Sequence, residues 1–162
     1  MSGVYDSRAD TLAHILLVRD NIEVFVSAML RRGRVHDASK FSAVEKPALD
    51  AVMPLLEGVA YGSPDWEAVV GRAAPALEHH YRHNSHHPEH YGNAGVSGMD
   101  LFDIVEMVCD WMAAATRHPG DGVKLAYNVE KFAIDPQLAA IIANTLARWP
   151  EAAADDLAAG PA

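Results

Sequence analysis

The sequence predicts an all-α fold of six to seven helices arranged as a compact bundle, and three observations predict it. Apolar residues recur at intervals of three and four along most of the chain. No segment keeps up the alternation of apolar and polar residues that half-buried strands require. Glycine, proline and small polar residues separate the periodic segments. With 162 residues, half of them apolar, we expect one domain over residues 1–150.

The first helical segment is expected over residues 7–32. Asp6 or Ser7 can cap its start, Gly33 ends it, and its apolar residues share the helical spacing: Leu12, Ile15, Leu16, Ile22, Val26, Met29 and Leu30. The polar connection RVHDASKF follows. A second helical segment opens at Ser42, which stands three residues before Glu45 as in a capping box. Pro54 should kink or end this segment.

The next helix is expected to begin with Ser63 as its cap and Pro64 as its first residue. It leads into HHYRHNSHHPEHY, residues 79–91, which contains six of the nine histidines of the chain. Asn84, Ser85, Pro88 and the stretch GNAGVSG, residues 92–98, combine turn formers with glycines. The histidine cluster therefore begins on a helix and ends on a loop.

An amphipathic helix, DLFDIVEMVCDWMAAATRH, is expected to open at Ser97 or Asp100 and to stop at Pro119 and Gly120. Two more helices are expected at roughly 121–133 and 136–148, the second with Asp135 as its cap. The alanine-rich, acidic tail over residues 151–162 is expected to be disordered.

The composition excludes several classes of function. A net charge of −9 argues against a surface that binds nucleic acid through its phosphates. The single cysteine, Cys109, excludes an internal disulfide and a thiolate zinc site, and it favours a reducing, cytoplasmic location. We expect no membrane span and no signal peptide. Small all-α domains often pair, so a homodimer is also considered.

The histidine cluster has three interpretations: a metal site, a proton switch or a solvated polar patch. His79 and His83 are four residues apart and share a helix face, whereas His80 points about 100 degrees away. Only some of the six histidines can therefore converge on one point. We expect His83 and His90 to be exposed to solvent.

Three further signals accompany the cluster. His36 and Asp37 are adjacent in HDASKF, which also contains Lys40. Three carboxylates fall on one face of the helix after the glycine-rich loop: Asp103, Glu106 and Asp110. His14 lies on a mainly apolar helix, where a lone histidine is more often part of the core.

In chain order these signals are a His, a His-Asp pair, several His and an Asp on a later helix. That order, over roughly residues 10–135, resembles the HD-domain superfamily of metal-dependent phosphohydrolases. HDASK is similar to the HD-x-G-K segment of the HD-GYP branch, with Ser39 where that branch has glycine and without its GYP tail. The chain also resembles small uncharacterised bacterial and phage proteins with HDxSKF and HHPEH segments, which bring no established activity.

The resemblance implies an HD-like helical bundle and a first metal site made of four residues: His14, His36, Asp37 and Asp110. Asp37 would bridge to a second metal held by His80 and one of His86 or His87. An unbroken helix would hold His14 and His36 roughly 30 Å apart. Either the first helix ends early, near Asp20 and Asn21, or His14 is not a ligand.

The same resemblance implies one or two divalent transition metals, and Mn, Fe, Co, Ni and Zn all suit these ligands. The metals would activate water for hydrolysis of a nucleotide or another small phosphoester. Asp37 would hold them, Lys40 would stabilise phosphoryl charge, and Glu45 or Glu106 would assist the water.

Two alternatives remain open at the level of sequence. One is a di-iron oxygenase, which some HD-like folds support with similar ligands. The other is a non-catalytic protein with a structural metal clamp or a pH-sensitive interface. In each case we expect six large apolar residues to be plain core: Met29, Met53, Trp66, Met107, Trp111 and Met112.

Overall fold

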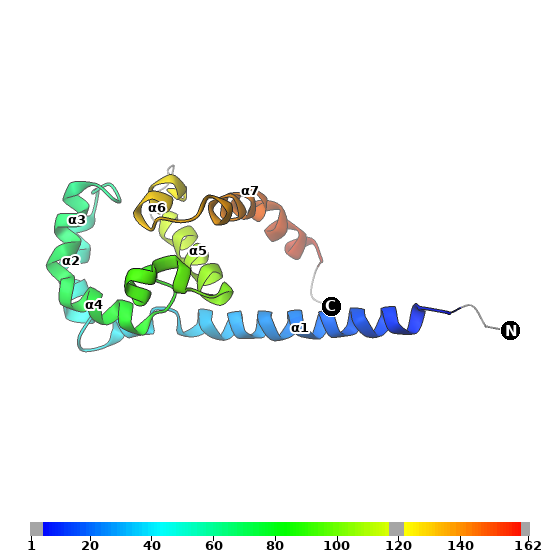
Figure 1. Ribbon diagram of the computed structural model, residues 1–162. Coiled ribbons are helices and arrows are strands. Elements are labelled where there is room, and N and C mark those ends of the chain that lie inside the picture. Colours follow the sequence, from blue (N-terminus) through cyan, green and yellow to red (C-terminus); the bar gives the residue numbers. More distant parts are fainter. Residues whose placement is uncertain (1–4, 117–121, 160–162) are drawn as a thin grey trace. The chain divides into compact units, whose positions relative to one another are not determined.

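The computed structural model describes residues 5–116 and 122–159, with side chains up to Trp149. This part of the chain contains seven α-helices, four 3₁₀ helices and no strand, which confirms the all-α prediction (Figure 1). Among the described helices, none has the length and apolar character needed to cross a membrane.

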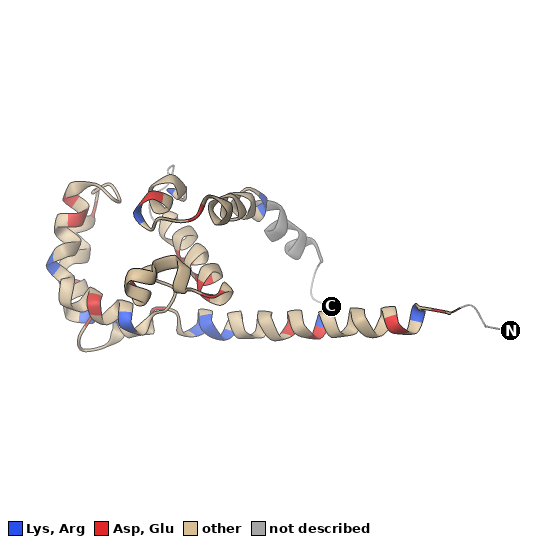
Figure 2. Ribbon diagram, in the orientation of Figure 1, with Lys and Arg blue, Asp and Glu red and all other residues tan. Residues whose placement is uncertain are grey.

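The chain divides into two compact units, unit 1, Met1–His36, and unit 2, Asp37–Ala162. The single domain over residues 1–150 stays a prediction. Unit 1 is built around one helix, α1 (Arg8–Val35), in which no residue is buried. Three arginines lie in its last turns: Arg31, Arg32 and Arg34 (Figure 2).

The helix expected over residues 7–32 forms as α1, which continues for 28 residues without a break and so excludes the alternative of an end near Asp20 and Asn21. No glycine or proline occurs in α1 before Gly33, so nothing in the sequence interrupts the backbone hydrogen bonds. Arg19 also pairs with Asp20 at 2.9 Å and with Glu23 at 3.4 Å across the predicted break.

The first half of unit 2 contains short helices: η1 (Ala38–Phe41), α2 (Lys46–Val52), η2 (Met53–Leu56), α3 (Pro64–Val70), η3 (Gly71–Ala73) and α4 (Ala74–His83). Two predicted boundaries are confirmed. The Ser63 hydroxyl accepts a hydrogen bond from the Trp66 amide at 3.2 Å, and α2 ends just before Pro54. η1 contacts both α2 and α4, so the segment after Asp37 lies beside the histidine-bearing helix.

The second half of unit 2 contains η4 (Pro88–Gly98), α5 (Leu101–Ala115), α6 (Leu125–Lys131) and α7 (Pro136–Ala159). Asp100 caps α5 as predicted, because its carboxylate accepts from the Asp103 amide at 2.9 Å and Asp103 closes a capping box. The predicted end of this helix at Pro119 and Gly120 lies outside the described residues.

α7 continues through Ala159 and so includes most of the segment over residues 151–162 that is expected to be disordered. Alanine is the strongest helix former, and no glycine occurs between Pro136 and Ala159. Residues 160–162 lie outside the described part of the chain.

The buried side chains of unit 2 are nearly as often polar as apolar among the described residues. The apolar set comprises Val52, Ala73, Ala76, Pro88, Met107, Val108, Ile134 and Ile142. The polar set comprises Glu45, His80, Asn84, His86, Asp103, Glu106 and Asn128. Met107 is core as predicted, but Met53 is 47% exposed, and Trp66 and Trp111 are only half-buried. So polar an interior requires a dense hydrogen-bond network.

Candidate metal centre

Four side chains of unit 2 bring one ligand atom each to a common point: Asp37, His80, His86 and His87. All four ligand atoms lie within 4.8 Å of one another. Asp37 Oδ1 is 3.2 Å from His80 Nε2 and 3.5 Å from His86 Nε2. The Nε2 atoms of His80 and His87 are 2.9 Å apart.

These separations match a metal-binding cluster. Donors held about 2.1 Å from one ion lie roughly 3.0–3.4 Å from each other in tetrahedral or octahedral arrangements. One carboxylate and three imidazoles are ligands that suit Mn, Fe, Co, Ni and Zn. The four residues therefore fit a divalent transition metal both by type and by spacing.

The backbone at Asp37 directs its carboxylate into the cluster. Asp37 has φ 56 and ψ 15, a left-handed conformation that is uncommon outside glycine. It stands in the sequence between the end of α1 and the start of η1. Backbone conformations of this kind occur preferentially at functional sites.

Two buried glutamates hold the other ring nitrogen of two histidines. His80 Nδ1 donates to Glu45 Oε2 at 2.9 Å, and His86 Nδ1 lies 3.2 Å from Glu106 Oε1. Metal-binding histidines typically donate their second N–H to a carboxylate, which fixes the tautomer and the orientation of the ring. The Nε2 lone pairs of His80 and His86 are thereby turned toward Asp37.

Glu45 remains ionised despite being 1% exposed. Burial raises its pKa, but hydrogen bonds from His79, Ser39 and His80 together outweigh burial and bring the pKa below its ordinary value. The sequence pattern suggested a capping box between Ser42 and Glu45. Only half of it forms, because Ser42 Oγ accepts from the Glu45 amide at 3.2 Å while the carboxylate turns toward the histidines.

His87 is a neutral imidazole at physiological pH. Burial, followed by the charges of His86 and His80, lowers the pKa of His87 to about 3. A metal ligand must offer a lone pair, so a histidine that resists protonation is suited to this role.

Ser39 and Asn84 connect η1 to α4 beside the cluster, and the sequence pattern did not single them out for this role. The Asn84 side-chain amide donates to Ser39 Oγ at 2.7 Å and to the His80 carbonyl at 2.8 Å. Ser39 Oγ lies 3.2 Å from His80 Nδ1. A glycine at position 39 would remove this connection.

Asp103 anchors the loop that carries His86 and His87 to α5. Its carboxylate, which is 2% exposed, accepts from Ser85 Oγ at 2.6 Å and from the Tyr91 hydroxyl at 2.5 Å. The two bonds flank the histidine pair in sequence. Asp103 thus determines where the pair stands relative to Glu106, one turn later on the same helix.

Two further predicted residues lie near the cluster. Lys40 Nζ donates to Asp37 Oδ2 at 2.5 Å, on the oxygen that does not face the histidines. Asp110 is half-buried on α5, and its charge acts to raise the pKa of His87. Glu106, which we expected to assist a water, contacts a histidine ring and is placed to orient it.

The structure does not bring His14 and His36 together. His14 is exposed on α1, and His36 is the C-cap of the same unbroken helix. A separation of 22 residues corresponds to roughly 33 Å along a helix, so the two cannot share an ion within one chain. His14 therefore cannot complete the predicted four-residue site with His36, Asp37 and Asp110. His36 is the last residue of unit 1 and is half-buried.

The other clustered histidines point elsewhere. His79 donates to Glu45 Oε1 at 2.7 Å, and its ring stacks on His83 at 4.1 Å. His83 and His90 are exposed, as expected, and each donates from Nδ1 to a backbone carbonyl, at 2.8 and 2.7 Å respectively. The six histidines thus separate into three that converge and three that do not.

Comparison with known proteins identifies the family but not an activity. No curated protein and no solved structure shows a significant match to the chain. A protein-family model described as a family of unknown function, DUF5662, matches residues 3–148 and thus covers both the HDASKF segment and the histidine cluster. The chain belongs to the DUF5662 family.

Proposed function

We propose that this protein is a metal-dependent phosphohydrolase that cleaves a small phosphoester at the cluster of Asp37, His80, His86 and His87. One observation carries the proposal: four ligand atoms converge within 4.8 Å, and buried glutamates hold two of the histidine rings in position. Buried carboxylates that contact the far side of ligand-type rings are typical of metal centres.

The four direct ligands leave room for an anionic substrate on the ion. Asp37 contributes one negative charge and neutral imidazoles none, so a divalent ion would keep a net positive charge against these four ligands, while the carboxylates of Glu45 and Glu106 contact the outer side of the rings. Lys40 adds a second positive charge next to Asp37. Such an ion supplies a water of lowered pKa and neutralises charge on phosphoryl oxygens.

The roles of the residues follow from their contacts. Asp37, His80, His86 and His87 bind the ion, whereas Glu45 and Glu106 orient His80 and His86. Lys40 is 42% exposed and already directed at the cluster, so its ammonium can reach a phosphoryl oxygen. Asp110, on the neighbouring helix, can accept a proton from a water that approaches the cluster.

The ligands that the HD-domain resemblance implies include Asp37 and His80 with His86 or His87, which are also ligands in this proposal. The resemblance implies His14 as well, which this proposal does not use. A reducing, cytoplasmic location, favoured by the single cysteine, is part of the same proposal. Two alternative functions, a di-iron oxygenase and a structural metal clamp, would use the same ligands. Metal identity and turnover, measured as described below, distinguish them from a phosphohydrolase.

The first experiment is elemental analysis of untagged wild-type protein beside Asp37→Asn and His80→Ala. We expect about one transition metal per wild-type chain and a loss of at least about 100-fold in metal affinity in each variant, because a direct ligand is removed. Asp50→Asn, which alters an exposed carboxylate of α2, is the matched control and should retain the metal.

The second experiment measures turnover of the metal-loaded protein. We expect phosphate or p-nitrophenol release from p-nitrophenyl phosphate or its diester, and its loss in Asp37→Asn. Iron with oxygen consumption would identify an oxygenase instead. A bound metal that raises the melting temperature without any turnover would identify a structural clamp, and a chain that binds no transition metal would overturn all three.

A further inference from the structure

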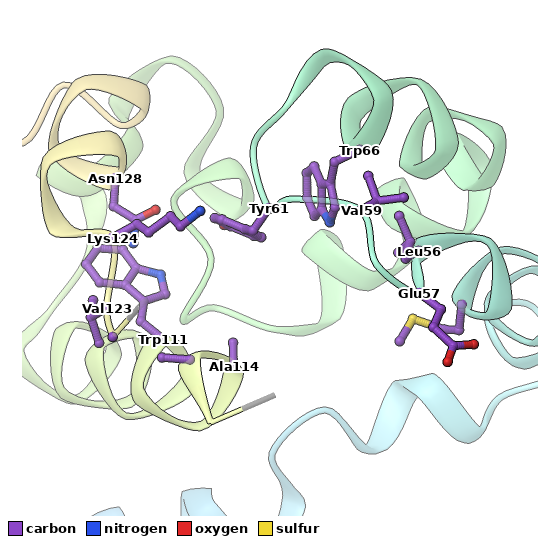
Figure 3. Close-up of a pocket in the computed structure, with 13 residues that line it drawn as sticks. Leu56, Glu57, Val59, Tyr61, Trp66, Trp111, Ala114, Val123, Lys124 and Asn128 are labelled. Carbon is purple, nitrogen blue, oxygen red and sulfur yellow. The ribbon is translucent and has the colours of Figure 1, made fainter. Parts of the chain in front are cut away.

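Unit 2 also contains a cavity, separate from the histidine cluster, whose walls include several aromatic side chains. It has a volume of about 340 Å³ and is lined by residues of η2, α3, α5 and α6 (Figure 3). Tyr61 and Trp66 lie toward one side, and Trp111, Lys124 and Asn128 toward the other. A volume of this size is at the lower end of the range for small-molecule sites.

Contacts among the rings hold the cavity walls in place. Tyr61 meets Trp66 edge to face at a centroid distance of 4.7 Å, and it meets Tyr127 in the same way at 5.6 Å. Gly62 has φ +75, and a Cβ there would lie 2.7 Å from the Tyr127 ring, so only glycine permits this approach. Trp111 lies parallel to Phe132 at 6.1 Å.

One polar atom of the cavity has no hydrogen-bond partner among the residues that the structure describes. Asn128 lines the cavity and is 3% exposed, and its Oδ1 accepts no hydrogen bond from residues 5–116 or 122–159. A buried acceptor without a donor destabilises a folded protein, so such atoms are rare and call for an explanation such as a bound ligand. A ligand that carries an N–H group would supply the missing donor.

We propose that this cavity binds a small, flat, neutral heteroaromatic ring whose N–H donates to Asn128 Oδ1. The rings of Tyr61, Trp66 and Trp111 offer stacking and edge contacts to a flat ligand, and Asn128 sets its orientation. The charged residues at the cavity are one of each sign, Glu57 and Lys124, so the lining has no net charge.

The hydroxyl of Tyr61 does not add charge either. Burial, followed by the neighbouring Tyr127 and the charges of Asp110 and Glu89, raises the pKa of Tyr61 to about 12. Tyr61 is therefore neutral at physiological pH. The absence of net charge favours a neutral ring over an anion or a cation.

The ring site is independent of the metal centre, although the two share α5. Asp110 acts on the pKa of His87 in the cluster and on that of Tyr61 in the cavity, whereas Trp111 and Ala114 line the cavity directly. Binding of a ring requires no metal, so this proposal can fail while the proposed function stands, and the reverse also holds.

The test compares two probes by NMR titration of the full chain: benzimidazole, which has one ring N–H, and 1-methylbenzimidazole, which has none. We expect saturable shifts of the Trp66 and Trp111 indole signals with benzimidazole and about tenfold weaker binding of the methylated probe, as one lost hydrogen bond to a buried acceptor predicts. Equal affinities in the wild type would overturn the proposal.

Three variants locate the binding. Asn128→Leu, of similar volume, should bind both probes equally, because the acceptor is gone. Ala114→Phe should fill the cavity and abolish binding, whereas the matched variant Ala113→Phe changes an exposed residue that does not line the cavity. Circular dichroism confirms that each variant is folded. If Ala114→Phe binds benzimidazole as the wild type does, or cyclohexanol shifts the same signals as strongly, the site is not a ring site.

Discussion

The two ends of α5 face different kinds of region. Toward its N-terminus, Asp103 and Glu106 hold the loop and the ring of a buried histidine cluster. Toward its C-terminus, Trp111 and Ala114 line a mostly apolar cavity. In the cluster, polar side chains hold one another in position around a common point. In the cavity, the Oδ1 atom of Asn128 has no hydrogen-bond donor among the described residues. Changes on one side of α5 should therefore leave the other side intact.

The largest effect is expected from Asp103→Ala. Its carboxylate accepts from Ser85, from Tyr91 and from the Asp100 amide that closes the capping box of α5, so its loss should lower the free energy of unfolding by about 3 kcal/mol. Denaturant unfolding measures this loss. Asp65→Ala, at an exposed residue in the first turn of α3, is the control and should cost less than about 1 kcal/mol. A small loss at Asp103 would mean that the loop is held in another way.

A weaker, more selective effect is expected from Glu106→Gln and Glu45→Gln. Each should lower metal affinity by about 10- to 100-fold, because loss of the carboxylate partner loosens the histidine ring and lowers its basicity. Competition with a chromophoric chelator measures the affinity. Glu78→Gln, an exposed residue of α4, should leave it unchanged, and all three variants should bind benzimidazole as the wild type does.

The pH dependence of stability tests the cavity side. Tyr61 has a pKa of about 12 in the folded chain against an ordinary value of 10, mainly because it is buried. The unfolded chain therefore ionises first, so the contribution of Tyr61 is complete below pH 10 and is lost as the pH rises toward 12. Tyr61→Phe should lose less stability over this interval than the wild type. Urea unfolding measures the stability of both proteins between pH 10 and pH 12. Equal losses of stability in the wild type and in Tyr61→Phe would contradict the raised pKa of Tyr61.

The smallest effect is expected from the histidines that point outward. His83→Ala and His90→Ala remove exposed rings that bond only to backbone carbonyls, so metal affinity should stay within about twofold of the wild type. Isothermal titration with Zn²⁺ measures this. A tenfold loss would show that the converging set is larger than three histidines.

Much of the fold could be predicted because its signals are local. Ser63 and Asp100 cap their helices as the sequence indicates, since capping requires only a side chain and amides two or three residues later. Residue type and order also identified Asp37, His80, His86 and His87. They could not identify Glu45 as a partner of both His79 and His80, because that contact joins residues 34 and 35 positions apart.

The cavity could not be predicted for a different reason. Trp66, Trp111 and Met53 occur at helical spacing, which is equally typical of core residues. Only their partial exposure, together with the buried Asn128, distinguishes a cavity wall from a core. The length of α1 was predicted closely from its local pattern, whereas the resemblance wrongly placed His14 in a metal site, which required a break that the local sequence does not provide.

The left-handed backbone conformation of Asp37 lowers the stability of the fold, whereas the carboxylate of the same residue belongs to the proposed metal site. Residues with a Cβ are less stable than glycine in this conformation by about 1 kcal/mol. A glycine at position 37 would relieve that strain and remove the carboxylate of the proposed metal site in the same step. Selection of random variants for heat tolerance alone would tend to enrich such a glycine, whereas selection that also demands a bound metal would retain the aspartate.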